Sequence, residues 1–198
     1  GSTNKNQCVS ESDYVNMKNY LGTSVKDGAV FVNQIQKRNG DINGNGVYDV
    51  YDYAYTMFKL DVGTKQKGKV SGNACLYFEK ERVSEGELFQ VLVTGKDVQN
   101  VNALGRVIAY DPSRLEFVSV KKSSLVSQME DLTINKSYGD GTAYVNLAFA
   151  NRGDKALCGG SGELASITFR ALAGLRLEEE LPERNIWLIG PEYDLIEN

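Results

Sequence analysis

The sequence predicts an α+β protein in which a small helical region precedes an antiparallel β-sandwich. A twelve-residue loop at 41–52, rich in oxygen-bearing side chains, lies between two segments with helical periodicity. From about residue 68 onward, short runs rich in β-forming residues alternate with clusters of turn-forming residues. At 198 residues, the chain is long enough for one large domain or two small ones.

The loop at 41–52 has the residue spacing of a calcium-binding EF-hand. Oxygen-bearing side chains occupy loop positions 1, 3, 5, 9 and 12, and position 7 would supply its backbone carbonyl. The predicted ligands are Asp41, Asn43, Asn45, Val47, Asp49 and Asp52. Gly46 at position 6 permits the sharp turn, because glycine adopts positive φ without a steric penalty. The spacing therefore predicts a Ca²⁺ site, and a polar turn without metal is the alternative.

Position 12 of the loop departs from the common EF-hand pattern. Asp52 replaces the usual bidentate Glu and is one methylene shorter, so the loop must close more tightly or a water must fill the gap. Asp at this position is what bacterial dockerin repeats use, and residues 41–52 resemble such a repeat at every ligand position. Only three carboxylates line the loop, so we expect the affinity of an extracellular calcium module rather than that of a cytosolic buffer.

Helical periodicity is present on both sides of the loop. Residues 30–38 have one apolar face, and residues 53–60 run without Gly or Pro and end before Gly63. An upstream stretch, 11–21, resembles the tail of a second dockerin repeat. No series of Asp and Asn residues precedes this stretch, so we interpret it as a helix that packs on the EF-hand, with at most a degenerate site.

The second region is predicted to contain a series of short strands joined by turns. Alternation of apolar and polar residues at 89–93 and at 165–169 indicates strands with one buried and one solvated face. The predicted strands are 74–78, 88–93, 101–110, 115–120, 132–138, 142–150 and 163–172, with turns at 84–86, 94–95, 111–113, 139–141 and 159–162. A stretch of this length can bury a core of its own.

Residues 68–174 resemble a cohesin domain. In the run 107–120, a strand ends in Tyr-Asp-Pro and a Leu-Glu-Phe strand follows, which is similar to the central cohesin signature. Residues 162–171 resemble the cohesin strand after a Gly-rich turn, and residues 84–89 resemble the entry to an early strand. The resemblance implies an antiparallel sandwich of the jelly-roll type. The expected domains are a helical dockerin-like region at 1–65, a cohesin-like sandwich at 68–174, and a C-terminal tail at 175–198 with a last strand.

Dockerins and cohesins are the two halves of a calcium-dependent docking system of secreted polysaccharide-degrading proteins. The resemblance thus implies a non-catalytic docking and scaffolding module of a bacterial secreted or cell-surface protein, similar to the tail of a glycoside hydrolase. Its partner would be a cohesin or dockerin module, in cis or in trans. In dockerins the partner surface includes loop positions 10 and 11, here Val50 and Tyr51. Alternatively, both residues pack with Tyr48 and Tyr55 against the chain's own sandwich, and we expect one compact unit in cis.

Composition excludes several other functions. The chain has no histidine, which removes Ser-His-Asp chemistry, Cys-His chemistry and most zinc sites. A net charge of −4 argues against nucleic acid or an anionic membrane surface as partner. No apolar run approaches the length of a membrane span. The three cysteines, Cys8, Cys75 and Cys158, leave both a disulfide and free thiols open.

Two rival functions need other residues. Catalysis of glycoside hydrolysis would need a carboxylate pair, and the acids available are Glu178–Glu180 and Glu130–Asp131. Such charge runs are more often solvated faces than active sites. The main alternative is a carbohydrate-binding sandwich stabilised by calcium. Its sugar-stacking candidates are Trp187, Tyr138, Tyr144 and Tyr193. The run 185–189 around the only tryptophan is better interpreted as a final strand with a core residue.

Overall fold

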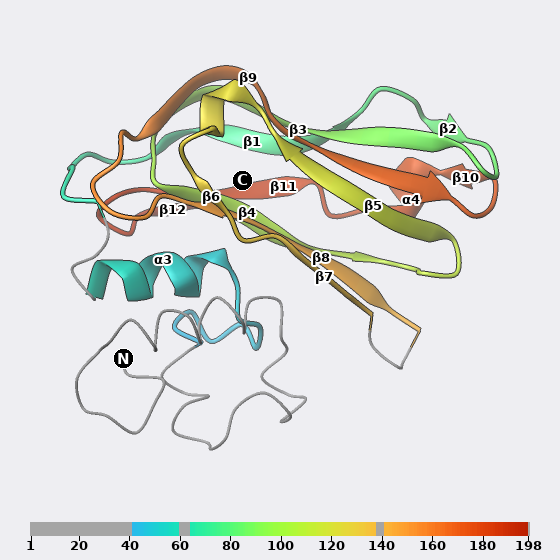
Figure 1. Cartoon of the computed structure of the whole chain (residues 1–198), viewed down its shortest axis with the longest axis horizontal. Coiled ribbons are helices and arrows are strands. Elements are labelled where there is room, and N and C mark those ends of the chain that lie inside the picture. Colours follow the sequence, from blue (N-terminus) through green and yellow to red (C-terminus); the bar gives the residue numbers. More distant parts are fainter. Residues whose placement is uncertain (1–40, 60–63, 138–140, 198) are drawn as a thin grey trace.

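The computed structural model describes residues 41–59, 64–137 and 141–197. Within these ranges, a sandwich of antiparallel strands carries one helix of ten residues against an outer face (Figure 1). The fold is thus a β-sandwich with a small helical N-terminal part, as the sequence predicts. The helices expected at 11–21 and 30–38 lie outside the described residues.

The strands form one hydrogen-bonded path and one small additional pair. The path runs β5-β9-β3-β1-β11-β4-β8-β6, with β12 paired to β11 and β7 paired to β8, while β2 pairs with β10. The bounds are β1 Ser71–Phe78, β2 Arg82–Val83, β3 Leu88–Val101, β4 Ala103–Tyr110, β5 Leu115–Lys122, β6 Glu130–Asp131, β7 Ile134–Ser137, β8 Ala143–Ala150, β9 Cys158–Ala171, β10 Leu175–Arg176, β11 Asn185–Ile189 and β12 Leu195–Ile196. The helices are α3 Val50–Lys59, η2 Ser124–Val126 and α4 Leu177–Glu180.

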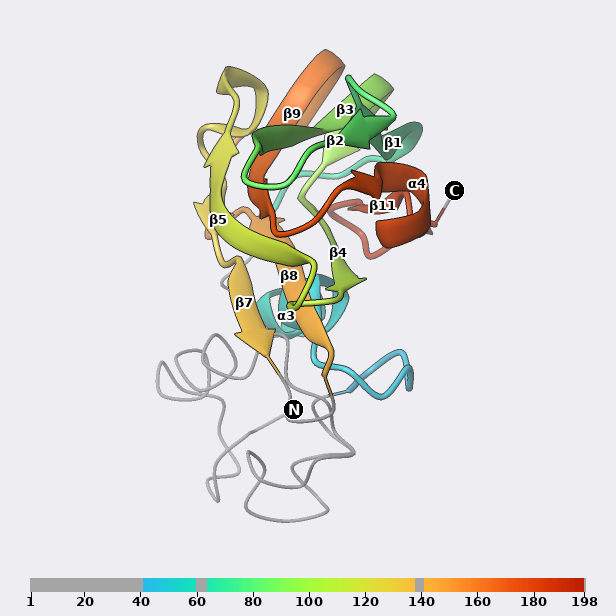
Figure 2. The same ribbon diagram turned by 90° about the vertical axis from the view of Figure 1, so that its right-hand side faces the viewer.

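The main core lies between two layers of this path. Inward-facing residues of β3, β9 and β1 meet those of β4, β8 and β11 in one buried cluster, and Figure 2 shows the layers from the end of the sandwich. Phe169 of β9 is at its centre, with ring centroids 6.0 Å from Phe89, 5.5 Å from Tyr110 and 6.0 Å from Phe117. Strand β11, predicted from the 185–189 run, joins the layers because it lies between β1 and β4.

Strands β3 and β9 are longer than the sequence predicts. The turns expected at 94–95 and 159–162 are wrong, because both segments continue as paired strand. The pairing survives through irregularities, with register shifts between Val93 and Thr94 and between Gly95 and Val98. Gly160 and Gly162 have φ values of 129° and 136°, which side-chain-bearing residues rarely adopt. The extra residues of these bulges are 96–97 and 99–100 on β3 and Leu164 on β9, and the two glycines are paired residues beside them in a long strand pair rather than a turn.

The remaining differences from prediction are at element ends. The strand expected at 132–138 is present as the shorter β7, and the short strand β6 precedes it at 130–131. Val101 ends β3 instead of starting β4. The acidic segment after residue 175 forms β10 and the single turn of α4. None of the described helices is long and apolar enough to cross a membrane.

Two of the three cysteines lie within the described residues, and both are free thiols. Cys75 is exposed on β1, and Cys158 is buried at the start of β9. Burial raises the pKa of the Cys158 thiol to about 11, against a smaller opposite effect of the hydrogen bond from Gln128. Cys158 therefore stays protonated near neutral pH and behaves as a small core residue. Cys8 lies outside the described residues.

Gly105 of β4 lies close to the backbone of β8, and replacing it tests this packing. A Cβ at this position would lie 2.0 Å from the carbonyl oxygen of Leu147. Gly105→Ala is expected to lower the free energy of unfolding by about 2 kcal/mol, because the two backbones must move apart. Urea denaturation measures the change. Gly174→Ala is the control, since a Cβ there meets no atom within 4 Å. Equal stability of both variants would contradict the prediction.

Candidate metal centre and docking helix

Helix α3 lies on the outer face of the layer that contains β4 and β8. A second buried cluster, separate from the main core, joins the helix to this face. The helix side contributes Tyr48, Val50, Tyr53, Ala54 and Met57, and the sheet side contributes Ala103, Leu132, Ala148, Ala150 and Ile189. Figures 1 and 2 both place α3 beside this layer. The sandwich therefore buries residues on both faces of one of its two layers.

The sequence of β8 explains why a helix fits there. Along 145–150, large side chains point into the main core, whereas Ala148 and Ala150 point to the outer face. Because these side chains are short, a helix can approach the sheet closely at this face. All residues of 145–150 are buried, which is the pattern of a strand covered on both faces. In the sequence, this strand is a run of mostly apolar residues with alanines at 148 and 150. That run is the signal that could have identified the helix-binding face.

Both predicted partner-binding residues contact the chain's own sandwich. Val50 is fully buried in the second cluster, and Tyr51 is half-buried against it. Tyr48 is fully buried as well. Tyr53 donates a long hydrogen bond of 3.4 Å from its hydroxyl to Glu130 Oε2 on β6. In this structure Val50 and Tyr51 thus pack against the chain's own sandwich, which is the second of the two alternatives given above.

Two acids link the loop at 41–52 to the start of α3. Asp49 precedes the helix, and its Oδ1 accepts hydrogen bonds from the backbone N–H of Tyr51 at 2.8 Å and of Asp52 at 3.4 Å. Asp52 accepts in return from the N–H of Asp49 at 3.0 Å. This reciprocal cap resembles a capping box and fixes where α3 begins. The two residues that cap the helix, Asp49 and Asp52, are therefore also the predicted metal ligands at loop positions 9 and 12.

The remaining predicted ligands surround the same acids. Asp49 Oδ2 accepts from the side-chain amides of Asn45 at 2.6 Å and Asn43 at 3.5 Å. Asp52 Oδ1 accepts from the N–H of Ile42 at 2.7 Å, which draws the start of the loop to its end. Asp41 Oδ2 accepts from the N–H of Gly46 at 3.0 Å, and Gly46 has the positive φ, 86°, that the sequence predicts. The loop is therefore closed on itself.

The electrostatics of this closed loop are unfavourable without a cation. Asp49 and Asp52 are both fully buried. Burial, followed by the charge of Asp49, raises the pKa of Asp52 to about 8, and burial also raises the pKa of Asp49. Asp41 Oδ1 is buried and has no hydrogen-bond partner among the described residues. Among the described residues neither carboxylate has a basic partner, and a bound cation relieves such an arrangement.

These residues fit a calcium ion by their chemistry. Three carboxylates, two side-chain amides and the Val47 carbonyl are all oxygen donors, which a hard cation prefers. Within 41–59, 64–137 and 141–197, no three His, Cys, Asp or Glu side chains are arranged as a metal-binding group. An EF-hand loop does not need such a group, since amide and backbone oxygens complete its coordination. Bound calcium would supply positive charge between the acids and hold the loop closed.

A cluster of aromatic rings lies along one flank of α3. Tyr193, in the loop between β11 and β12, has its ring centroid 5.2 Å from Tyr51, 4.5 Å from Tyr55 and 5.5 Å from Phe58. The helix thus contacts both the sheet and a loop near the C-terminus. Tyr193 was considered from the sequence only as a sugar-stacking residue, because nothing local predicts its contact with residues 51–58.

The other aromatic candidates for sugar stacking lie elsewhere. Trp187 is partly buried against the second cluster, with the guanidinium of Arg106 5.7 Å from its ring centroid. Its neighbours in β11 are core residues, as the sequence predicts. Tyr144 is half-buried on β8, and Tyr138 lies outside the described residues. The described candidates therefore do not form a shared aromatic platform.

The acidic run considered for catalysis is engaged in ion pairs. Glu178 pairs with Arg184 at 3.1 Å, Glu179 with Arg176 at 3.6 Å, and Glu180 with Arg114 at 2.6 Å. Each acid thus has its own basic partner, and these pairs tie α4 to neighbouring segments. The run 178–180 therefore has a structural role and is largely exposed to solvent, as expected for a run of charged residues.

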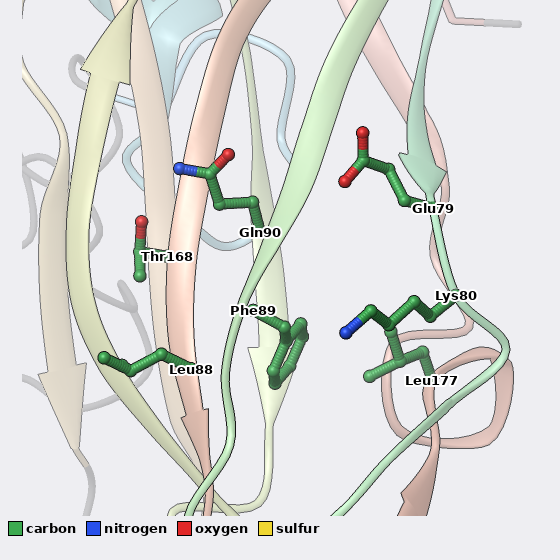
Figure 3. Close-up of a pocket in the computed structure, with 7 residues that line it drawn as sticks. All are labelled: Glu79, Lys80, Leu88, Phe89, Gln90, Thr168 and Leu177. Carbon is green, nitrogen blue, oxygen red and sulfur yellow. The ribbon is translucent and has the colours of Figure 1, made fainter.

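A hollow of about 350 Å³ lies on the opposite layer, away from α3. Figure 3 shows its lining, in which the side chains of Lys80 and Leu177 point toward Phe89. Glu79, Leu88, Gln90 and Thr168 complete the lining. The ammonium of Lys80 pairs with Glu87 at 2.5 Å. With its one cation already paired, this hollow lacks the convergent polar groups of a ligand site.

Comparison with protein families gives two matches in sequence order. A cohesin domain matches residues 78–179, which is just over half of the chain, and a dockerin type I domain matches residues 3–59. No curated protein gives a significant match. The loop at 41–52 and helix α3 thus belong to the dockerin match, and most of the sandwich belongs to the cohesin match.

Solved cohesin structures resemble the chain at low identity. A type II cohesin domain from the cellulosome of Acetivibrio cellulolyticus is 15% identical with a TM-score of 0.46, over 65% of this chain and 89% of that one. A non-cellulosomal cohesin from the archaeon Archaeoglobus fulgidus is 17% identical with a TM-score of 0.41, over 66% and 84%. A type I cohesin–dockerin complex from Clostridium thermocellum gives 12% identity and 0.43, over 64% and 91%.

These matches settle the class of protein. Cohesin and dockerin domains bind one another and are non-catalytic, so the activity of the matched regions is protein–protein docking rather than catalysis. The chain belongs to the cohesin family, and it carries a dockerin type I region in front of its cohesin domain.

Proposed function

We propose that the chain is a calcium-stabilised docking module of an extracellular, bacterial polysaccharide-degrading protein, and that its dockerin region docks in cis on its own cohesin sandwich. The observation that carries the proposal is the burial of Val50, Tyr53 and Met57 of α3 against Ala148 and its neighbours. The occurrence of both halves of a docking system on one chain supports the extracellular setting.

Calcium acts in this proposal as the folding device of the dockerin region. The ion would be held by Asp41, Asn43, Asn45, the carbonyl of Val47, Asp49 and Asp52. Because Asp49 and Asp52 also cap α3, closing the loop sets the start of the helix and so the placement of its docking side. The buried acids and the unpartnered Asp41 oxygen support this role.

Docking in cis also controls access for other partners. Val50 and Tyr51, the residues proposed for partner binding, are covered by the chain's own sheet and by Tyr193. A cohesin in trans would therefore have to displace the chain's own sandwich, which the connecting residues 60–69 keep at high effective concentration. The docking helix is therefore bound to its own sandwich, and it can bind a partner in trans only after it leaves that sandwich.

Cleavage of the connection between the two parts tests docking in cis. Lys65 and Lys67 are exposed, so trypsin can cut the full-length chain between α3 and β1. With millimolar Ca²⁺, the two pieces are expected to co-elute in size-exclusion chromatography, because the second cluster holds them together without the connection. After chelation they are expected to separate. Separation of two folded pieces while calcium is present would refute docking in cis.

A further inference from the structure

The loop between β11 and β12, residues 190–194, contacts both helix α3 and the segment 68–70 that leads into β1. Its backbone closes through hydrogen bonds from the N–H of Gly190 to the Asp194 carbonyl at 2.9 Å and from the N–H of Tyr193 to the Gly190 carbonyl at 3.3 Å. Strand β12 pairs with β11, so the loop is fixed to the middle of the sheet. The loop is therefore an ordered part of the sandwich.

The same loop is fastened to the segment that leads from α3 to β1. Asp194 Oδ2 accepts from the N–H of Val70 at 2.5 Å, and Glu192 Oε2 accepts from the N–H of Gly68 at 3.3 Å. Two acids of the loop thus hold the chain just before β1. Between them in the sequence lies Tyr193, whose ring contacts α3.

Tyr193 has an unusual backbone conformation at the end of this turn. Its φ is 80°, in the left-handed region that bulky residues rarely occupy and that costs free energy. Such a conformation persists only where surrounding contacts maintain it. Here the turn hydrogen bonds of 190–194 require a left-handed residue, and the Tyr193 ring contacts three rings of α3, Tyr51, Tyr55 and Phe58, of which Tyr55 meets it edge-on at an interplanar angle of 62°.

We propose that Tyr193 is a positioning residue that latches the docking helix onto the sandwich and thereby decides between docking in cis and in trans. The proposal rests on docking in cis as the function of α3. The helix contacts the sheet through Val50 and its neighbours and the Tyr193 ring through a flank, so it leaves only when these ring contacts break. The ring also covers Tyr51, which a partner in trans would need. The β11–β12 loop would thus favour docking of α3 in cis over docking in trans.

Hydrogen–deuterium exchange of the full chain in millimolar Ca²⁺ tests the latch. In the unaltered chain, amides of residues 50–59 are expected to be protected. Tyr193→Ala removes the ring and should speed their exchange about tenfold, given aromatic pair energies. Tyr193→Phe keeps the ring and should stay within about twofold of the unaltered chain. Tyr77→Ala, which removes a half-exposed tyrosine from β1, is the matched control and should leave α3 protected.

The outcomes separate the latch from docking itself. If residues 50–59 of the unaltered chain exchange as fast as an unfolded peptide, docking in cis is wrong. If they are protected and Tyr193→Ala leaves them protected, docking stands and the latch is wrong. If Tyr193→Ala speeds exchange in β3 and β9 as much as in α3, the residue supports the whole sandwich and the latch is again wrong.

Discussion

Calcium is expected to raise the Tm of the chain, and Asp52→Asn is expected to remove most of that increase. Extracellular calcium modules bind with dissociation constants of about 0.1–1 mM. At about 10 mM Ca²⁺, linkage then adds about 1.4–2.7 kcal/mol to the stability of the folded state. For a chain of this size the increase corresponds to about 3–10 °C. Calorimetric or fluorescence unfolding at several calcium concentrations measures it.

The behaviour of Asp52→Asn without calcium makes this prediction sharper. The substitution keeps the shape of the side chain and replaces a buried acid whose pKa burial and the charge of Asp49 raise to about 8. It also removes one acceptor, because Asp52 accepts from Ile42 and from Asp49. These effects offset each other, so the Tm in chelator should change little while the calcium response is lost.

A charge-matched control separates site binding from general screening. Glu163→Gln also removes one negative charge, from an exposed position on β9. This variant should keep the full calcium response. Equal responses of Asp52→Asn, Glu163→Gln and the unaltered chain would show that calcium acts elsewhere, and the loop at 41–52 would then be a polar turn without metal.

Met57→Asp is expected to release α3 from the sandwich while leaving the sandwich folded. Met57 is fully buried between the helix and the sheet. Burial of an unpaired carboxylate costs on the order of 4 kcal/mol, more than one helix face can offset. The helix would undock instead, since Met57 lies outside the main core. After tryptic cleavage at 64–67, the two pieces of this variant should separate even with calcium present.

The sandwich side of the contact offers a reciprocal test. Ala148→Asp places the charge on the outer face of β8, where Ala148 is also fully buried in the second cluster. It should give the same separation of pieces as Met57→Asp. Leu88→Asp is the control, because Leu88 is 53% exposed on the other layer. If Met57→Asp and Ala148→Asp behave like Leu88→Asp, the helix does not dock on this face in solution.

Predictions from local pattern succeeded where a structure depends on near neighbours. The alternation in 89–93 and 165–169 correctly indicated strands. The run 185–189 correctly indicated a strand, but not the last one, because β12 follows it. The positive φ of Gly46 follows from loop spacing alone. Local pattern failed at 94–95 and 159–162, because glycines terminate a strand or lie beside a bulge within it depending on what lies opposite. There, each segment lies opposite the other.

The position of α3 on the sandwich is a long-range property. The spacing of Asp41, Asn43, Asn45, Asp49 and Asp52 identifies a candidate calcium loop from twelve consecutive residues, since coordination by a short loop depends on sequence interval. Which residues cover Val50 and Tyr51 depends instead on the small side chains of β8 and on Tyr193, more than a hundred positions later. The apolar run of β8 indicates a strand covered on both faces, but it does not say which segment covers it, and no local motif marks Tyr193. Burial on both faces of a strand requires a partner from elsewhere in the chain.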